Sequence, residues 1–201
     1  MKKTLALIAL AAVPLAQADE MLDPIQQQWA VCQYQSAAKQ SCLQSLSQKA
    51  DQASVAAPQR ADLLIWAAIV KSSWAGAKGG LGALSLVKAA KVQLEQAIKQ
   101  DGKALEGSAY TSLGSLYYQV PGWPVGFGDK ELAEKNLKQA LAINPNGIDP
   151  NFFYGDFLLE QGRKDEARQY LSKALAAPAR AGRELADRGR RKEIEERLAK
   201  L

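Results

Sequence analysis

A helical pattern that recurs at a fixed interval constrains the fold of this chain more than any other feature. The pattern is a small residue, a large apolar residue four positions later and an Ala-Leu pair, and it recurs 34 positions further along. A third copy precedes the first by 43 positions. This spacing is typical of a helix with one buried face, and no segment alternates as a strand. The copies begin at Ala90, Ala133 and Ala167.

Each copy follows another apolar helix that carries a small residue, Ala67, Gly114 or Gly155. Helix pairs of this length cannot bury an apolar face alone, so they stack and form an α-solenoid. The sequence therefore predicts an all-α fold, with residues 19–201 as one domain. The clearest repeats are 105–145 and 149–178; a divergent repeat covers 59–100, a degenerate helix pair covers 23–56, and a C-terminal capping helix covers 183–201.

The segments Leu113–Tyr117 and Ala133–Pro145 resemble the tetratricopeptide repeat (TPR). The stretches PGWPVGFGD and ALAINPNGIDPN are similar to a family of exported bacterial repeat proteins, with a more distant similarity to the T component of TRAP-type transporters. The resemblance implies a curved stack whose first helices line a concave groove. The groove positions that the pattern implies, as a hypothesis for partner binding, are Lys71, Thr111, Ser115, Tyr118, Phe152, Asp156 and Glu160.

Two insertions interrupt the repeats. The segment 120–127 mounts Trp123 and Phe127 between prolines and glycines, whereas a merely tolerated insertion would be polar. Its rings either pack back onto the helices as a lid or line a binding site. The glycine-rich segment 76–82 predicts a crossover between helices that could fold beside the Trp123 loop.

The chain has no histidine, which excludes His-dependent nucleophiles and His-ligated metals. Asp156 and Glu160 share a helix face at i, i+4, a spacing that permits an acid/base pair. No nucleophile or metal motif accompanies them, so we expect a protein that is not an enzyme and has no cofactor and no metal.

The N-terminus predicts export. Lys2 and Lys3, a short apolar run and Ala16-Gln17-Ala18 form a cleavable signal peptide over residues 1–18. We therefore expect a periplasmic protein, or alternatively a secreted one. In that compartment Cys32 and Cys42 favour a disulfide. The bond requires the chain to reverse near Ala37, because ten residues of helix would hold the cysteines about 15 Å apart.

The C-terminal segment 163–201 is basic, but acids are interleaved with its 12 Lys and Arg residues. This favours a solvated helix with Arg188, Arg190, Arg191 and Lys192 in water, and no nucleic-acid partner. We expect a binding or docking module for a protein or peptide of the cell envelope, without stable membrane insertion. Two alternatives remain: an accessory of a solute transporter that binds a substrate-binding protein or small ligand, and a cell-envelope hydrolase.

Overall fold

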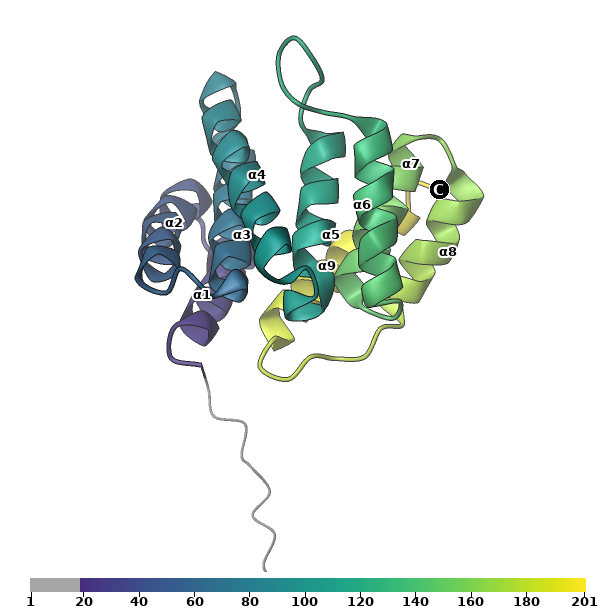
Figure 1. Cartoon of the computed structure of the whole chain (residues 1–201). Coiled ribbons are helices and arrows are strands. Elements are labelled where there is room, and N and C mark those ends of the chain that lie inside the picture. The colour runs from purple at the N-terminus through teal and green to yellow at the C-terminus, as the bar shows by residue number, and fades with distance from the viewer. Residues whose placement is uncertain (1–18) are drawn as a thin grey trace, which may run out of the picture.

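The computed structural model describes residues 19–201, and the predicted signal peptide lies outside this range. Between residues 19 and 201 the chain forms nine α-helices and no strand, as expected for an all-α fold (Figure 1). The helices are α1 (Leu22–Tyr34), α2 (Lys39–Ala56), α3 (Ala61–Lys78), α4 (Leu81–Asp101), α5 (Ala104–Gln119), α6 (Lys130–Ile143), α7 (Ile148–Glu160), α8 (Lys164–Leu175) and α9 (Glu184–Leu198).

The helices pack as consecutive pairs, and the first helices α1, α3, α5 and α7 form a row in which each contacts the next. Equivalent positions of two successive repeats make the same contact between their helices. A Cβ added to Gly114 of α5 would lie 2.7 Å from Cγ of Leu137 in α6, and one added to Gly155 of α7 would lie 2.8 Å from Cγ of Leu171 in α8. The same close helix contact therefore recurs in successive pairs.

In the divergent repeat the register differs by one residue from the prediction. Ala68, rather than Ala67, packs in the core cluster that contains Ala90 and Leu94 of α4. Ala67 packs in the cluster formed with α1 and α2. Because α3 is buried on both of these faces, it carries small residues at two adjacent positions, and the sequence pattern alone does not distinguish them.

The connection between α1 and α2 reverses the chain over residues 35–38, at the point where the cysteine spacing requires it. Cys32 and Cys42 form a disulfide with their Cα atoms 5.5 Å apart. The bond joins α1 and α2, the two helices of the degenerate pair.

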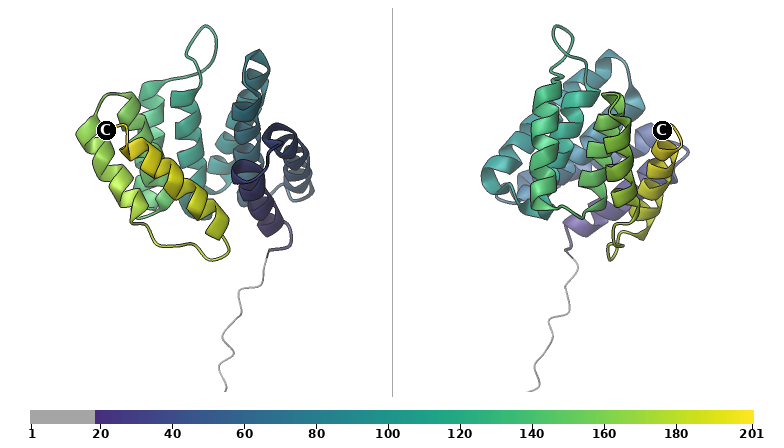
Figure 2. Two further views of the ribbon diagram at one scale, coloured as in Figure 1. Left: turned by 180° about the vertical axis from the view of Figure 1, so that it is seen from behind. Right: turned by 90° about the vertical axis from the view of Figure 1, so that its right-hand side faces the viewer.

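Helix α9 closes the row of first helices on itself. It packs on α8 and α7 and also contacts α1, the first helix of the chain (Figure 2). Arg188 and Lys192 face water as expected. The expectation was wrong for Arg190, which is 9% exposed because its guanidinium group covers the rings of Phe152 and Phe153 at 4.4 and 4.7 Å.

None of the helices in residues 19–201 combines the length and the apolar character that a membrane span needs.

Candidate functional site

A chamber of about 1400 Å³ lies inside the row of first helices. Side chains from α1, α3, α5 and α7 form its walls, and α9 covers part of the side that an open solenoid would expose (Figure 2). Leu81, the first residue of α4, and Val125 of the α5–α6 loop border the chamber and are 84% and 54% exposed. The chamber therefore reaches the surface between these two segments.

The chamber walls divide into a polar and an aromatic part. Hydroxyl and amide groups of α3 and α5 form the polar part. Trp29, Trp66, Phe152 and Phe153 provide the aromatic part. Aromatic rings offer a large contact area at low entropic cost, and hydroxyl groups both donate and accept hydrogen bonds. The polar wall is made of Ser72, Ser73, Thr111, Ser112, Ser115 and Gln119.

Four of the predicted groove residues line this chamber: Thr111, Ser115, Phe152 and Asp156. Ser115 is half-buried, whereas the side chains of the other three are buried. Phe152 and Asp156 are only 3% and 4% exposed because α9 lies over them. The accessible wall is therefore the α3 and α5 side.

Tyr118 joins α5 to α7 rather than facing the chamber. Its hydroxyl donates to Oδ2 of Asp156 at 2.8 Å, and Nε of Arg197 in α9 donates to Oδ1 of the same carboxylate. Burial raises the pKa of Tyr118 well above its ordinary value, and the charge of Asp156 raises it further. The phenol therefore stays protonated as a donor, and Asp156 acts as the junction of three helices.

Lys71 and Glu160, also predicted for the groove, lie outside the chamber. Lys71 extends from α3 between α2 and α4, where its Nζ binds Asp51 at 2.7 Å and Gln93 at 3.1 Å. The displacement follows from the one-residue shift of register in α3. Glu160 is the last residue of α7, and much of its side chain is in water. The part of its carboxyl environment that excludes water raises its pKa, and the charge of Asp156 raises it further.

The arrangement around Asp156 offers no acid/base pair. Both of its oxygens are occupied, by Tyr118 and Arg197, and Glu160 lies on the exposed end of the helix. Between residues 19 and 201 there is also no group of three or more Cys, Asp or Glu side chains placed to hold a metal ion.

A charged cluster that the sequence did not reveal fixes α9 in place. Oδ2 of Asp149 in α7 accepts from Arg180 at 2.6 Å, and Oδ1 accepts from Arg190 at 2.8 Å. Burial alone would raise the pKa of Asp149, but the two guanidinium groups outweigh it and lower the pKa to about 2. Asp149 lies in the first turn of α7, which begins at Ile148.

A second set of contacts joins α9, and Arg183 at its N-cap, to α1 and α3. The guanidinium group of Arg183 lies 4.8 Å from the ring centroid of Trp66 and donates to Oε1 of Gln26 at 3.1 Å. Gly189 faces the ring of Tyr34 so closely that a Cβ there would lie 2.5 Å from three ring atoms. The cation–π contact of Arg183 and the close packing of Gly189 on Tyr34 thus hold α9 against the first helices of the row.

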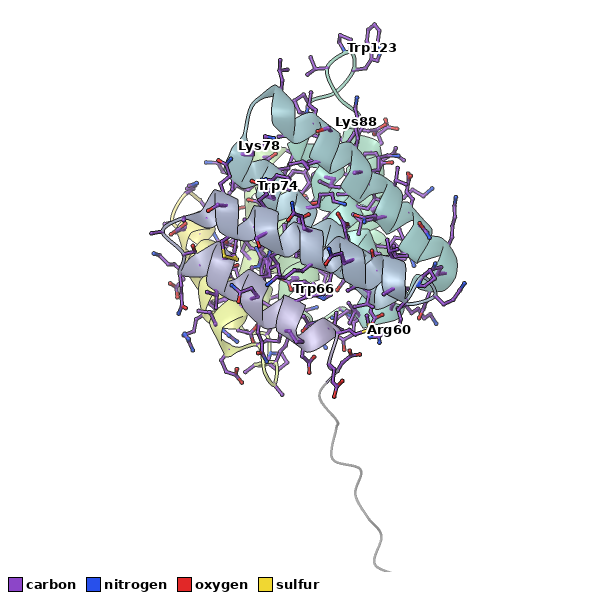
Figure 3. The ribbon with its side chains drawn as sticks, turned by 90° about the vertical axis from the view of Figure 1, so that its left-hand side faces the viewer. Arg60, Trp66, Trp74, Lys78, Lys88 and Trp123 are labelled. Carbon is purple, nitrogen blue, oxygen red and sulfur yellow. A yellow bond between two sulfur atoms is a disulfide. The ribbon has the colours of Figure 1, made fainter. Side chains whose placement is uncertain are left out.

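The two rings of the α5–α6 loop have separate roles. Phe127 is half-buried and packs edge-on against Tyr117 with ring centroids 5.9 Å apart, so this ring packs back onto the helices. Trp123 is 90% exposed and stands at the tip of the loop, away from the helices (Figure 3). It does not line the chamber, whereas its neighbour Val125 does.

Stacked helix pairs, a repeated glycine–leucine contact and the row of first helices define a TPR-like α-solenoid. A tetratricopeptide-repeat family model matches residues 126–186, from the α5–α6 loop into α9. The similarity to tetratricopeptide repeats suggests a protein–protein interaction module.

Two crystal structures of similar fold are those of MamA and of TTC0263, a thermophilic TPR protein in Thermus thermophilus. MamA is 18% identical, the match covers 83% of this chain and 93% of that chain, and the TM-score is 0.47. For TTC0263 the identity is 19%, the coverage is 87% and 99%, and the TM-score is 0.42. No curated protein matches the chain.

Proposed function

We propose that the protein is a non-catalytic binding module of the bacterial cell envelope, which holds an extended segment of a partner protein in the chamber. The observation that carries the proposal is the chamber itself, whose accessible wall presents hydroxyl and amide groups of α3 and α5. Such a wall can bind both the backbone and the side chains of a peptide. The N-terminal signal-peptide pattern supports a periplasmic or secreted location.

The size of the chamber favours a peptide over a small solute. Small-molecule sites usually measure about 300–1000 Å³ and enclose most of the ligand. The chamber is larger, at about 1400 Å³, and reaches the surface beside Leu81 and Val125. The alternative function, an accessory of a solute transporter, would use the same chamber for a small ligand or a substrate-binding protein.

Blocking the chamber tests the proposal. Ser112 is a half-buried wall residue of α5, and the indole of Ser112→Trp would occupy the space beside it. Ser45→Trp places the same ring on the exposed face of α2, outside the chamber, and serves as the matched control. Circular dichroism and thermal unfolding would establish that both variants fold.

Peptides selected against the purified wild-type protein by display provide the ligand, and fluorescence anisotropy measures their binding. We expect Ser112→Trp to weaken binding at least about tenfold, since each 1.4 kcal/mol lost changes affinity by that factor, and Ser45→Trp to leave it unchanged. Equal binding to all three proteins would refute the chamber as the site. Crosslinking in the envelope fraction, with mass spectrometry, would then identify the natural partner of the wild-type protein that Ser112→Trp no longer captures.

A further inference from the structure

Two uncharged segments project from the same end of the solenoid. One segment is residues 79–87, which comprises the α3–α4 connection and the first turns of α4. The other is the α5–α6 loop, residues 120–128. Neither segment contains an ionisable side chain. Figure 1 shows both tips at the upper end, the loop extending furthest. Leu81 and Val125 border the same chamber, and Lys91 of α4 contacts the Phe127 ring of the loop. We call these two segments together the apical rim.

The apical rim exposes three large apolar side chains. Trp123 is 90% exposed, Leu81 is 84% exposed and Val125 is 54% exposed. A tryptophan in this state leaves most of its ring in water, although indole is the side chain that most favours the boundary between a bilayer and water. The other three tryptophans, at positions 29, 66 and 74, are buried or half-buried in the helix packing.

The loop that carries Trp123 is built to hold it outward. The amide of Gly128 donates to the carbonyl of Pro121 at 2.9 Å, and the amide of Gly126 donates to that of Gly122 at 3.0 Å. A Cβ on Gly126 or Gly128 would collide with the backbone of residues 120–122, so only glycine permits this close crossing. Phe127 anchors the base of the loop, and Trp123 is left free at the tip.

Lysines surround the base of the rim. Lys78 and Lys88 are exposed, and Figure 3 shows them below the tip that carries Trp123. Lys91 links the two segments, because its Nζ lies 5.8 Å from the ring centroid of Phe127. Lys91 is paired with Glu95 at 2.5 Å. Glu131 lies in the first turn of α6, and Asp129 is engaged by the amides of Glu131 and Leu132 as the helix cap.

We propose that the apical rim binds the surface of an anionic lipid bilayer, with Trp123 and Leu81 among the headgroups and Lys78 and Lys88 against the lipid charges. Aromatic and aliphatic side chains supply the buried apolar area, and lysines near the surface add electrostatic attraction. Lysine stems can lie along the apolar layer while their ammonium groups stay in water. The contact is interfacial and reversible, and it lies beside the opening of the chamber, which Leu81 and Val125 border.

Sedimentation of the full mature chain with vesicles tests this inference. The vesicles contain phosphatidylcholine mixed with phosphatidylglycerol, or phosphatidylcholine alone. We expect binding to the anionic vesicles and a reduction of about tenfold in Trp123→Ala and Leu81→Ser, because each loses one inserted side chain. Val92→Ser and Val55→Ser are matched controls, since these valines are 61% and 77% exposed but lie on α4 and α2 outside the rim.

Two further readouts separate this surface from general adhesion. The indole fluorescence should shift to the blue on vesicle binding in the wild type and not in Trp123→Ala. The pair Lys78→Gln/Lys88→Gln should bind anionic vesicles more weakly than Lys49→Gln/Lys173→Gln, which removes two exposed lysines elsewhere. Absence of vesicle binding, or equal binding by Trp123→Ala and wild type, would overturn the proposal.

Discussion

The contact between Gly189 and Tyr34 provides a quantitative test of the closed ring. Gly189 lies inside α9, and a Cβ there would meet Cγ, Cδ1 and Cδ2 of the Tyr34 ring at 2.5 Å. Carbon atoms in ordinary contact are about 3.5–4.0 Å apart. Gly189→Ala therefore requires α9 or Tyr34 to move by about 1 Å, which is an overpacking that typically costs about 1–3 kcal/mol.

A second helical glycine supplies the control. Gly76 lies in the last turn of α3, and a Cβ there would meet nothing within 4 Å. Replacing glycine by alanine in a helix stabilises the protein by about 1 kcal/mol. Both variants receive this gain, but only Gly189→Ala has the clash. We expect Gly76→Ala to gain about 1 kcal/mol and Gly189→Ala to be about 1–3 kcal/mol less stable than Gly76→Ala.

Urea unfolding followed by circular dichroism measures both free energies of unfolding. The double variant Gly189→Ala/Tyr34→Ala completes the cycle, because removing the ring should restore the space and recover most of the coupling. If Gly189→Ala gains as much stability as Gly76→Ala, then α9 does not press on α1. The solenoid would then be open on this side, and the description of α9 as the cover of the chamber would be wrong.

Two other predictions concern the covalent and ionic ties. Reduction of the Cys32–Cys42 disulfide should lower the free energy of unfolding by about 3 kcal/mol, the value expected for a loop of this length, and thiol titration in denaturant should find no thiol before reduction and two after it. Acidification through the lowered pKa of Asp149, from the ordinary 3.8 to about 2, should remove a contribution of up to about 2 kcal/mol that is complete at higher pH. Asp149→Asn should be less stable at neutral pH and lose less over this range, as unfolding curves at each pH would show.

The repeat architecture could be predicted from the sequence because it rests on local spacing. Ala133, Leu137 and Ala140 are fully buried, as are their counterparts 34 positions later, and each set faces a glycine of the preceding helix. Two helices can pack this closely only where one of them carries a small residue, and that residue is visible in the sequence. The cap of α6 is equally local, because the Asp129 side chain accepts from the amides of Glu131 and Leu132, two and three positions along the chain.

The closure by α9 could not be predicted because it joins residues that are distant in sequence. Arg190 and Asp149 are 41 positions apart, and so are Arg197 and Asp156. In the sequence these arginines belong to a run of mixed charge, which usually indicates a solvated helix face. Only the turn of the whole solenoid brings α9 back to α1 and decides which of its arginines are buried.

The charges of α9 determine which part of the concave face can serve a partner. The half-buried carboxylate of Asp149 and the buried carboxylate of Asp156 would be unfavourable without cations, and Arg180, Arg190 and Arg197 are the cations that compensate them. A partner that displaced α9 would have to replace these ion pairs and also cover Phe152 and Phe153. A partner that enters beside Leu81 and Val125 needs no such exchange, because the hydroxyl and amide groups of α3 and α5 face the chamber there. The physical cost of displacing α9 therefore directs recognition to the α3 and α5 wall.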